Sequence, residues 1–411
     1  MTPDPQQPID LEEAQEIIFR TSTVQPVEEI PLAESLGRFP LQSLKALEPL
    51  PGYDQSLRDG FAVAGVGDEK KTPSSVFRVV DEVAAGDTRQ ITLHPGEAVR
   101  IMTGGLLPRG CQAVVPQELC HCEGENVRIA ADCLTEKGKG RFIHARGSEF
   151  ARGDVLAAKG APITPESQIL LAGGGYGSLP VARKVRISFF CTGSELLSAP
   201  VAGGGGQKFS ANNSLLQGLI RQNGCSLVEQ RTVMDDPDAV VKLFHELGKS
   251  DSDILISTGG MGPGKFDLIE ESFARVGGRP MYHSLRLRPG KSTLFGTLGN
   301  TLFFGLPGPP PAVHFLFNGL VRPAILALQG AKRCSPRKIR GILTREMHLP
   351  KSELPRLKGA VLRCEDGNCL VRPAGRGESA NCYIFCPARR RKLARGEKVS
   401  LHLLSSSPCA G

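Results

Sequence analysis

Tryptophan is absent from this 411-residue sequence, and aromatic residues make up only 5% of it. Proteins that hold single-stranded nucleic acid stack the bases on aromatic side chains, so this composition argues against a base-stacking surface. The first 15 residues lack the basic and then apolar pattern of a signal peptide. We therefore expect a cytoplasmic protein that does not bind nucleic acid.

Long uninterrupted apolar runs are missing as well. The most apolar stretch, residues 312–328, contains four residues that argue against a membrane span, namely His314, Asn318, Arg322 and Pro323. The G-x-x-x-x-G-K-[ST] motif does not occur, which excludes a P-loop enzyme, and there is no dinucleotide-binding fingerprint. Covalent catalysis has no support, because no nucleophile is accompanied by a positioned histidine.

The twelve cysteines do not have the spacing of zinc ligands. Cys120, His121 and Cys122 form a dense cluster, but Cys111 and Cys133 lie at separations unlike the paired C-x-x-C of zinc sites. We expect reduced, partly buried thiols, as is usual for cytosolic proteins.

Positive charge is concentrated in the last fifth of the chain. Residues 331–411 carry 18 Lys and Arg against 6 Asp and Glu, a net charge of +12. Because the whole chain has a net charge of +8, the first 330 residues carry −4. A basic region of this kind is either a solvated surface or an attraction for an anionic partner.

Chain length predicts two to four domains. Residues 10–21 have the acidic first turn and the apolar face of a helix. Residues from about 45 to 145 are rich in Val, Gly, Pro and Thr, and their short apolar runs (75–80, 98–102 and 113–116) predict an all-β insert. A helix is predicted at 165–171, with Thr164 as its N-cap and with Gly173, Gly174 and Gly175 ending it.

From residue 184 onward the pattern alternates between strands and helices. Strands are predicted at 185–191, 227–233, 253–258, 292–298 and 301–305, and helices at 213–223, 238–247, 267–276 and 312–328. This alternation predicts a parallel sheet covered by helices on both faces. After residue 330 the helical period disappears; a hairpin at 360–373 and strands at 381–386 and 397–404 predict a small β-barrel or sandwich.

Polar residues gather where the predicted parallel strands end, which is where open α/β sheets bind ligands. The run STGGMGPGKFD, residues 257–267, has four glycines that let backbone N–H groups surround an anion. Arg286, Arg288 and Lys291 add positive charge. The carboxylates that suit Mg²⁺ are Glu195, Asp235, Asp236 and Asp267.

Each of these features also has an ordinary structural explanation. A glycine-rich loop can be a plain tight turn, and a basic loop can be merely solvated. Asp236 precedes Pro237 and a predicted helix, and Asp267 begins one, so both are natural N-caps. Their convergence at one edge of the sheet is what favours a metal-bridged phosphate ligand.

The order of motifs resembles the molybdopterin molybdotransferases, that is, the bacterial MoeA proteins and the E domain of gephyrin. The resemblance runs from about residue 10 to 405 and rests on several segments in order. These are LPGYDQSLRDGFAV (50–63), VRIMTGGLLPRGCQAVVPQE (99–118), ARGSEFARGDVL (145–156), ISFFCTGSELL (187–197), VMDDPDAV (233–240), STGGMGPGKFD (257–267), RLRPGKS (286–292) and FFGLPGPP (303–310).

The resemblance implies an α/β protein with four domains, one of which is a βα sandwich with a parallel-rich sheet. Residues 1–45 with 146–182 would form an N-terminal linker and dimerisation domain, 46–145 an inserted β domain, 183–330 a molybdopterin-binding βα domain, and 331–411 a C-terminal β-barrel. It also implies an elongated homodimer that uses Mg²⁺ to insert molybdate into adenylylated molybdopterin and releases AMP. Other partners would be the molybdopterin adenylyltransferase and the molybdoenzymes or cofactor chaperones that receive the product; a membrane is not expected.

Site residues follow from the matching motifs. The resemblance assigns catalysis to Asp59, Asp267 and Lys291, and Mg²⁺ binding to Glu195, Asp236 and Asp267. It assigns substrate binding to Thr103, Thr192, Gly259, Gly260, Gly262, Gly264, Arg288, Ser292 and Pro307. Asp59 and Thr103 would come from the insert of one subunit and the others from the βα domain of another.

Several positions depart from the family pattern. Gly262 replaces a serine, Lys265 takes the place of an acidic residue, and the family sequence Gly-Asn-Pro-Val-Ser is Gly-Pro-Pro-Pro-Ala at 308–312. These changes predict a more positive pocket with weaker Mg²⁺ binding. Three alternatives therefore remain: a non-catalytic molybdopterin carrier, a tungstate-specific paralogue, and an anion-binding βα domain used for partner assembly.

Overall fold

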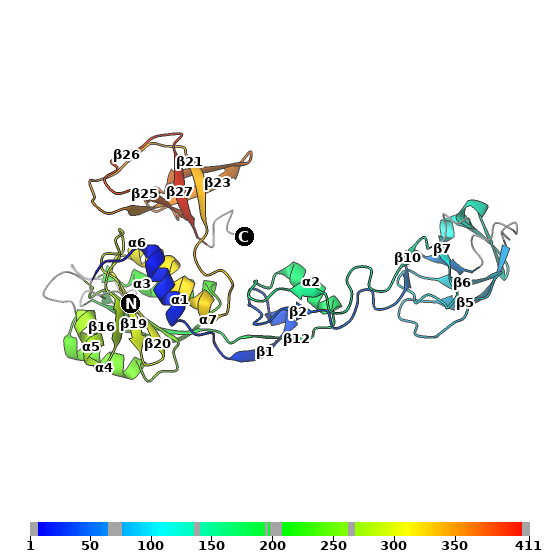
Figure 1. The fold of residues 1–411 in the computed structure, drawn as a ribbon, viewed down its shortest axis with the longest axis horizontal. Helices are drawn as coiled ribbons and strands as arrows, with labels where there is room; N and C mark the ends of the chain where they lie inside the picture. The colour runs from blue at the N-terminus through cyan, green and yellow to red at the C-terminus, as the bar shows by residue number, and fades with distance from the viewer. Residues whose placement is uncertain are drawn as a thin grey trace.

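The computed structural model describes residues 7–64, 76–134, 140–193, 196–197, 208–261 and 268–404. Figure 1 shows an elongated chain with the strands β5, β6 and β7 at one end and the helices α3–α7 at the other. The region of α2 and β2 lies between them, and the strands β21–β27 form a separate body beside the helical end (Figure 1).

The helical end is built on a six-stranded sheet with the order β16-β13-β17-β20-β19-β18. Its strands are β16 Ser226–Val233, β13 Arg186–Thr192, β17 Ile254–Thr258, β20 Thr301–Leu306, β19 Leu294–Leu298 and β18 Arg279–Tyr282. The first four are parallel, as predicted, but β19 and β18 are antiparallel to their neighbours. The predicted parallel-rich sheet is therefore confirmed. Only Gly299 and Asn300 separate β19 from β20, and so short a turn can join only antiparallel strands.

Helices cover both faces of this sheet, as predicted. One face packs against α1 Leu11–Thr21, α3 Ala211–Gln222, α6 Pro310–Leu316 and α7 Arg322–Leu328, and the other against α4 Pro237–Leu247 and α5 Leu268–Arg275. Successive residues of β13 alternate between the two cores: Phe189 belongs to the first and Phe190 to the second. In the second core, the Phe244 and Phe303 rings meet edge to face with centroids 5.2 Å apart.

The helix predicted at 312–328 is interrupted by a π-helical segment, Phe317–Val321, between α6 and α7. Pro310–Leu328 is the one helix in the described part of the chain that is long and apolar enough to cross a membrane, and most of it is buried inside the protein. Its apolar residues, among them Val313, Phe317 and Val321, belong to the first core of the sheet. Packing against the sheet therefore accounts for its composition.

The far end of the molecule is a second six-stranded sheet with the order β7-β4-β6-β5-β9-β8. Its strands are β7 Ala113–Pro116, β4 Gly60–Val63, β6 Glu97–Ile101, β5 Val76–Val83, β9 Asn126–Ile129 and β8 Cys120–Glu123, with short 3₁₀ turns at Gln117–Leu119 and Ala131–Leu134. Cys120 and Cys133 pack into its apolar core, and burial raises the pKa of the Cys120 thiol to about 12. These thiols are core residues, as expected.

The middle of the molecule consists of short antiparallel pairs and one helix. The pairs are β1 Val27–Pro31 with β12 Ser178–Ala182, β2 Leu44–Lys45 with β11 Val155–Ala157, and β3 Gln55–Ser56 with β10 Ile143–His144; Leu32–Glu34 is a 3₁₀ turn. Helix α2, Pro165–Gly173, begins with the predicted cap: Ser167 N–H donates to Thr164 Oγ1, and the Ser167 hydroxyl accepts from Thr164 N–H. This reciprocal pair is a capping box.

The C-terminal region is a closed barrel with the order β21-β24-β23-β25-β27, in agreement with the predicted β-barrel. Its strands are β21 Lys338–Leu343, β24 Asn368–Pro373, β23 Arg356–Glu365, β25 Cys382–Cys386 and β27 Lys398–Leu403; β22 Met347–His348 pairs with β26 Lys392–Leu393. The predicted hairpin is β23–β24. A further short parallel pair, β14 Leu196–Leu197 and β15 Lys208–Phe209, lies in the βα region.

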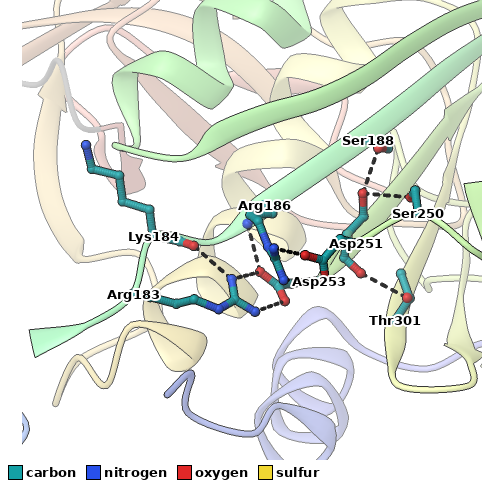
Figure 2. Close-up of polar contacts among 9 residues, drawn as sticks. Arg183, Lys184, Arg186, Ser188, Ser250, Asp251, Asp253 and Thr301 are labelled. Carbon is teal, nitrogen blue, oxygen red and sulfur yellow. Dashed lines mark hydrogen bonds and ion pairs between the residues drawn. The ribbon is translucent and has the colours of Figure 1, made fainter. Parts of the chain in front are cut away.

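A polar cluster lies at the amino ends of the parallel strands, where β12 leads into β13 (Figure 2). The Asp253 carboxylate accepts two hydrogen bonds from the Arg183 guanidinium, at 2.8 and 2.7 Å, and one from Arg186 N–H at 2.8 Å. Arg186 forms an ion pair with Asp251, and the buried hydroxyls of Ser188 and Ser252 lie 2.7 Å apart. These contacts attach the segment that enters the sheet to the start of β17.

Candidate functional site

Four chain segments meet at the carboxyl edge of the parallel strands. Strand β13 ends at Thr192, β17 at Thr258 and β20 at Leu306. Because β19 runs antiparallel, its first residue, Leu294, lies opposite Gly305 near the end of β20. The loop of residues 285–293 therefore reaches the same edge, which is where ligands of open α/β sheets bind.

Glycines 259 and 260 form a tight bend directly after β17. Both have positive φ, 89° and 63°, which favours glycine. A Cβ atom on Gly259 would lie 2.6 Å from the Thr192 carbonyl oxygen and 2.7 Å from Thr192 Oγ1. Gly259 N–H donates to Leu306 O at 3.1 Å, which fixes the bend against the end of β20. The backbone here comes closer to its neighbours than any side chain would permit.

Buried polar atoms at this edge lack partners within the described part of the chain. Thr192 Oγ1 and Asn212 Oδ1 are two of them, and the hydroxyls of Ser257, near the end of β17, and Ser210, directly before α3, are two more. The amide nitrogen of Asn212 donates to Gly308 O at 2.7 Å and to Thr258 Oγ1 at 3.3 Å, so Asn212 holds two strand ends together. Buried polar groups are nearly always hydrogen-bonded, and unsatisfied ones call for an explanation such as a bound ligand.

Asn212 was not among the residues that the sequence assigned to the site. It lies in the first turn of α3, which begins at Ala211. The one local signal that could have identified it is an amide side chain near the start of a helix that follows a strand end. Its importance as a tie between loops emerges only from the two contacts that it makes in space.

The basic loop 285–293 divides its charges between structure and solvent. The Arg286 guanidinium forms an ion pair with Asp10, 2.9 Å between Nη2 and Oδ2, and this carboxylate raises the pKa of Arg286. Arg286 is therefore a structural residue, although the sequence offered it as an anion ligand. Arg288 and Lys291 are exposed, and Lys291 has no ion pair to a described residue.

The C-terminal barrel attaches directly to this loop. Arg288 N–H donates to Pro355 O at 3.0 Å, and Leu357 N–H donates to Arg288 O at 2.9 Å. The first residues of β23 thus pair with the segment that carries Arg288. Ser292 precedes β19 and Pro307 follows β20, so both lie at the same carboxyl edge.

Asp59 directly precedes β4 and Thr103 lies in the turn after β6, so both lie beside the second sheet, at the opposite end of the molecule (Figure 1). Asp59 Oδ1 accepts hydrogen bonds from Thr103 N–H at 2.7 Å and from the Thr103 hydroxyl at 2.8 Å. These donors stabilise the ionised carboxylate and lower the pKa of Asp59. The two residues are therefore adjacent to each other but are not brought to Lys291 within one chain.

The proposed metal ligands are placed only in part. Asp236 is exposed, and its Oδ1 accepts from Ala239 N–H at 2.8 Å, the N-cap contact of α4. The remaining calls, Glu195, Gly262, Gly264 and Asp267, fall outside the described residues, as does Lys265. Within the described ranges, no three His, Cys, Asp or Glu side chains come together as a metal-ligand group.

Two clefts lie away from this edge. One, of about 750 Å³, adjoins the polar cluster at the amino edge and is lined by residues such as Arg183, Asp253 and Thr301. The other, of about 430 Å³, lies between the middle region and the barrel and is lined by residues that include Phe39, Arg322 and Leu403. Neither cleft contains the glycines or the unpartnered polar atoms of the carboxyl edge. The candidate site is therefore identified by these residues and not by the volume of a cleft.

Comparison with known proteins agrees with the predicted resemblance. Residues 9–175 match the family described as the MoeA N-terminal region, domains I and II, and residues 188–327 match the probable molybdopterin binding domain. The protein named molybdopterin molybdenumtransferase from Bacillus subtilis is 29% identical over 407 residues, which cover 97% of this chain and 94% of that protein. The protein of the same name from Staphylococcus aureus strain MRSA252 is 28% identical and covers 99% and 98% of the two chains.

Solved structures show the same fold. The crystal structure of the molybdopterin biosynthesis MoeA protein from Pyrococcus horikoshii superposes with a TM-score of 0.82 at 24% identity, covering 97% of this chain and 99% of that one. Both family matches, the full-length relatives and this architecture lead to one conclusion. The chain belongs to the MoeA family of molybdopterin molybdenumtransferases.

Proposed function

We propose that this protein inserts molybdate into adenylylated molybdopterin and releases AMP, a late step of molybdenum cofactor biosynthesis. The observation that carries the proposal is the carboxyl edge of the six-stranded sheet. There Gly259 leaves no room for a side chain, and two buried atoms, Thr192 Oγ1 and Asn212 Oδ1, lack partners among the described residues. The names of the full-length relatives support the choice of substrate.

The described residues suit the binding of a phosphate-bearing pterin. The bend at Gly259 and Gly260 lets an anion approach the backbone closely, and Thr192 and Asn212 offer polar atoms beside it. Lys291 and Arg288 are the cations of this edge, and they would neutralise the phosphates and the molybdate dianion. Ser292 and Pro307 would complete the walls. We expect these residues to bind and orient the substrate before the anhydride is cleaved.

Mg²⁺ remains part of the proposal through Glu195, Asp236 and Asp267. Carboxylate oxygens with bound phosphates are the ligands that Mg²⁺ prefers. In Asp236, one oxygen is already the cap of α4, which leaves the other for a metal. The ion would stabilise the charge that develops as the phosphate leaves. Molybdate and tungstate have nearly the same size and charge, so the AMP-release assay has to decide which of the two oxyanions the protein inserts.

A second copy of the chain would complete the site. Asp59 and Thr103 lie at the opposite end of the molecule from Lys291 (Figure 1), so one chain cannot supply both ends of the catalytic set. The middle region supports self-association, because Ile169 and Leu170 on α2 and Val155 on β11 are large apolar residues that remain exposed. We propose a homodimer in which each site combines the two ends of different subunits.

Activity is tested by AMP release from adenylylated molybdopterin with molybdate and Mg²⁺. Wild-type protein should release AMP only when molybdate is present, and Asp267→Ala should abolish the release without unfolding the chain. Asp59→Ala and Lys291→Ala should each be inactive alone. Mixing the two should restore about a quarter of the activity, since random reassortment makes half of the dimers mixed and each mixed dimer has one intact site.

Two results would contradict the proposal. Molybdate-independent AMP release, or none at all, would exclude the transferase. Failure of the mixture to regain activity, with exchange of subunits verified, would exclude the shared site.

A non-catalytic carrier is the second candidate, and one observation favours it. Helix α6 begins at Pro310, directly after Pro309, and has no side-chain cap, so the start of this helix offers few hydrogen-bond donors to an anion. Tight ligand binding without turnover would establish the carrier.

A further inference from the structure

Cys364 and Cys369 lie directly opposite each other in the β23–β24 hairpin of the C-terminal barrel. The pair next to the turn is Glu365 with Asn368, and Asp366 and Gly367 form the turn itself. Both turn residues have positive φ, 49° and 74°, the geometry of a two-residue type I′ turn. Among the described strands, this is the one register that sets two cysteines opposite each other.

The backbone contacts of Leu362 and Val371, two residues from the cysteines, show whether their pair is hydrogen-bonded or non-hydrogen-bonded. Leu362 N–H donates to Asn381 Oδ1 at 2.7 Å, and Leu362 O accepts from Asn381 Nδ2 at 3.0 Å. On the facing strand, Val371 O accepts from Thr344 N–H at 2.8 Å. The backbone groups of the Leu362–Val371 pair therefore point away from each other.

Antiparallel pairs alternate along the ladder, so Cys364 and Cys369 also form a non-hydrogen-bonded pair. The Cα atoms of such pairs are about 4.5 Å apart, and their side chains point to the same face. That spacing falls within the range of roughly 4.4–6.8 Å between the Cα atoms of disulfides. The hairpin therefore places the two sulfur atoms in a position to bond without a change of register.

Access separates this pair from most other cysteines. Cys364 is exposed and Cys369 is half-buried, and both are thiols in this structure. Burial raises the pKa values of Cys225, Cys334 and Cys382 to about 12. The thiolate is the form that attacks a disulfide, so these buried thiols react slowly.

We propose that Cys364 and Cys369 form a reversible dithiol–disulfide site that exchanges with small organic disulfides. One cysteine thiolate attacks a sulfur atom of the organic disulfide and releases one small thiol. The second cysteine then attacks the mixed disulfide and releases the other. The protein loses two protons and two electrons, which the organic disulfide takes up as it becomes two thiols.

The site is independent of the proposed molybdate transfer. Arg356, which pairs with the Arg288 segment, lies eight residues along β23 from Cys364, roughly 26 Å at the rise of a strand. The loop that the bond would close contains only four residues, so the disulfide would restrict the unfolded chain little. Its oxidation state is read by mass and thiol content, without any assay of activity.

The test treats the reduced full-length protein with oxidised glutathione under native conditions, removes excess reagent and blocks the remaining thiols with iodoacetamide. Trypsin cuts after Arg363 and Arg376 but not between Arg372 and Pro373, so both cysteines stay in one peptide. We expect this peptide to be two hydrogens lighter and free of both glutathione and carbamidomethyl. A further cut before Asp366 should leave two fragments joined by a bond that dithiothreitol breaks.

Matched cysteines provide the controls. Cys122 is exposed but faces Val127 in the β8–β9 pair, so it should keep a glutathione adduct rather than form an internal bond. In Cys369→Ser, Cys364 should retain glutathione in the same way. The ratio of disulfide to dithiol in a glutathione buffer should be about tenfold higher in the folded protein than in urea, because the hairpin raises the effective concentration of the two thiols.

Three outcomes would overturn the proposal. Stable glutathione adducts on both Cys364 and Cys369 would show that their sulfur atoms do not meet. A bond from either one to Cys409, which lies outside the described residues, would assign the chemistry elsewhere. Equal oxidation in the folded and the urea-unfolded protein would show that sequence proximity alone closes the loop.

Discussion

The two edges of the six-stranded sheet differ in how the oxygen atoms of their side chains are hydrogen-bonded. At the amino edge, Asp253 accepts from both Arg183 and Arg186, and the buried hydroxyls of Ser188 and Ser252 pair with each other (Figure 2). At the carboxyl edge, Thr192 Oγ1 and Asn212 Oδ1 are buried without partners among the described residues. The amino edge leaves one buried nitrogen, Arg186 Nε, without a partner among the described residues, but its carboxylate and hydroxyl oxygens are paired. Because polar groups are costly to bury unpaired, we propose that a ligand completes the two oxygens of the carboxyl edge.

The largest expected effect comes from removing the centre of the amino edge. Asp253→Ala leaves the Arg183 guanidinium, which is 23% exposed, without its partner and also removes the acceptor of Arg186 N–H. We expect the free energy of unfolding to fall by about 3 kcal/mol, as when one member of a mostly buried ion pair is removed. Urea denaturation followed by circular dichroism measures it, since the chain has no tryptophan for fluorescence.

Asp251→Ala is the matched control for that measurement. Asp251 pairs with Arg186, but its side chain is 78% exposed. Solvent screens such pairs, so the expected loss is below about 1 kcal/mol. Equal losses in the two variants would mean that Asp253 does not hold the amino edge together.

Filling the carboxyl edge at Gly259 should lower ligand affinity as well as stability, because the new methyl group meets atoms of Thr192. In Gly259→Ala, the new methyl group would lie 2.6 Å from the Thr192 carbonyl oxygen. We expect affinity for adenylylated molybdopterin, measured by calorimetry, to fall at least about tenfold, because the bend at Gly259 has to move away from Thr192 and the binding geometry is lost. Gly277→Ala controls for backbone strain: Gly277 has φ +82° but no atom within 4 Å of its Cβ position. Equal losses of affinity in the two variants would mean that backbone strain, and not the contact with Thr192, is responsible.

Removing one hydroxyl from each edge should have opposite effects on stability and on ligand affinity. Thr192→Val removes an unpartnered hydroxyl, so stability should be unchanged or slightly higher while ligand affinity falls by about 1 kcal/mol. Ser188→Ala removes a paired buried hydroxyl at the other edge, so stability should fall by about 1 kcal/mol with affinity unchanged. Thermal unfolding and calorimetry of both proteins provide the data. Loss of stability in Thr192→Val would mean that its hydroxyl has an internal partner.

The smallest expected effect is a change in the pKa of Asp59, beside the second sheet. It tests whether two hydrogen bonds stabilise an exposed carboxylate as the donors of the amino edge stabilise Asp253. Thr103 lowers the pKa of Asp59 below the ordinary value of 3.8 through two hydrogen bonds. The interaction therefore stabilises the fold above pH 3.8 and is lost as the pH falls through the lowered value. Thr103→Val should raise the pKa of Asp59, followed by NMR, because one of the two donors disappears. An unchanged titration would show that the backbone donor alone sets it.

Individual elements show where prediction from sequence succeeded. The α2 cap was predictable because Thr164 and Pro165 are local signals for a helix start. The β23–β24 turn was predictable because Asp366-Gly367 favours positive φ at both positions. The parallel-rich sheet was predictable from the alternation of strands and helices, and the two-residue gap between β19 and β20 is the local signal for their antiparallel pairing.

The candidate site was harder to predict, because its residues come from distant parts of the chain. Thr192, Gly259 and Pro307 do lie at one edge, as expected from parallel strand ends. Arg286 was predicted to bind an anion, but it forms an ion pair with Asp10, 276 residues away in the sequence. Asn212 was overlooked because its role depends on Gly308 O, which no local pattern places beside it. Asp59 and Lys291 remain at opposite ends of one chain, and their meeting stays a prediction.

The sequence by itself determined the elements and the family, because caps, turns and apolar periodicity act over a few residues and the motifs occur in a specific order. Tertiary structure alone decided which polar groups are satisfied. A carboxylate such as Asp253 and a hydroxyl such as Thr192 Oγ1 look equally polar in the sequence. Only the packing of distant strands gives the first one three donors and leaves the second buried without a partner in the described chain.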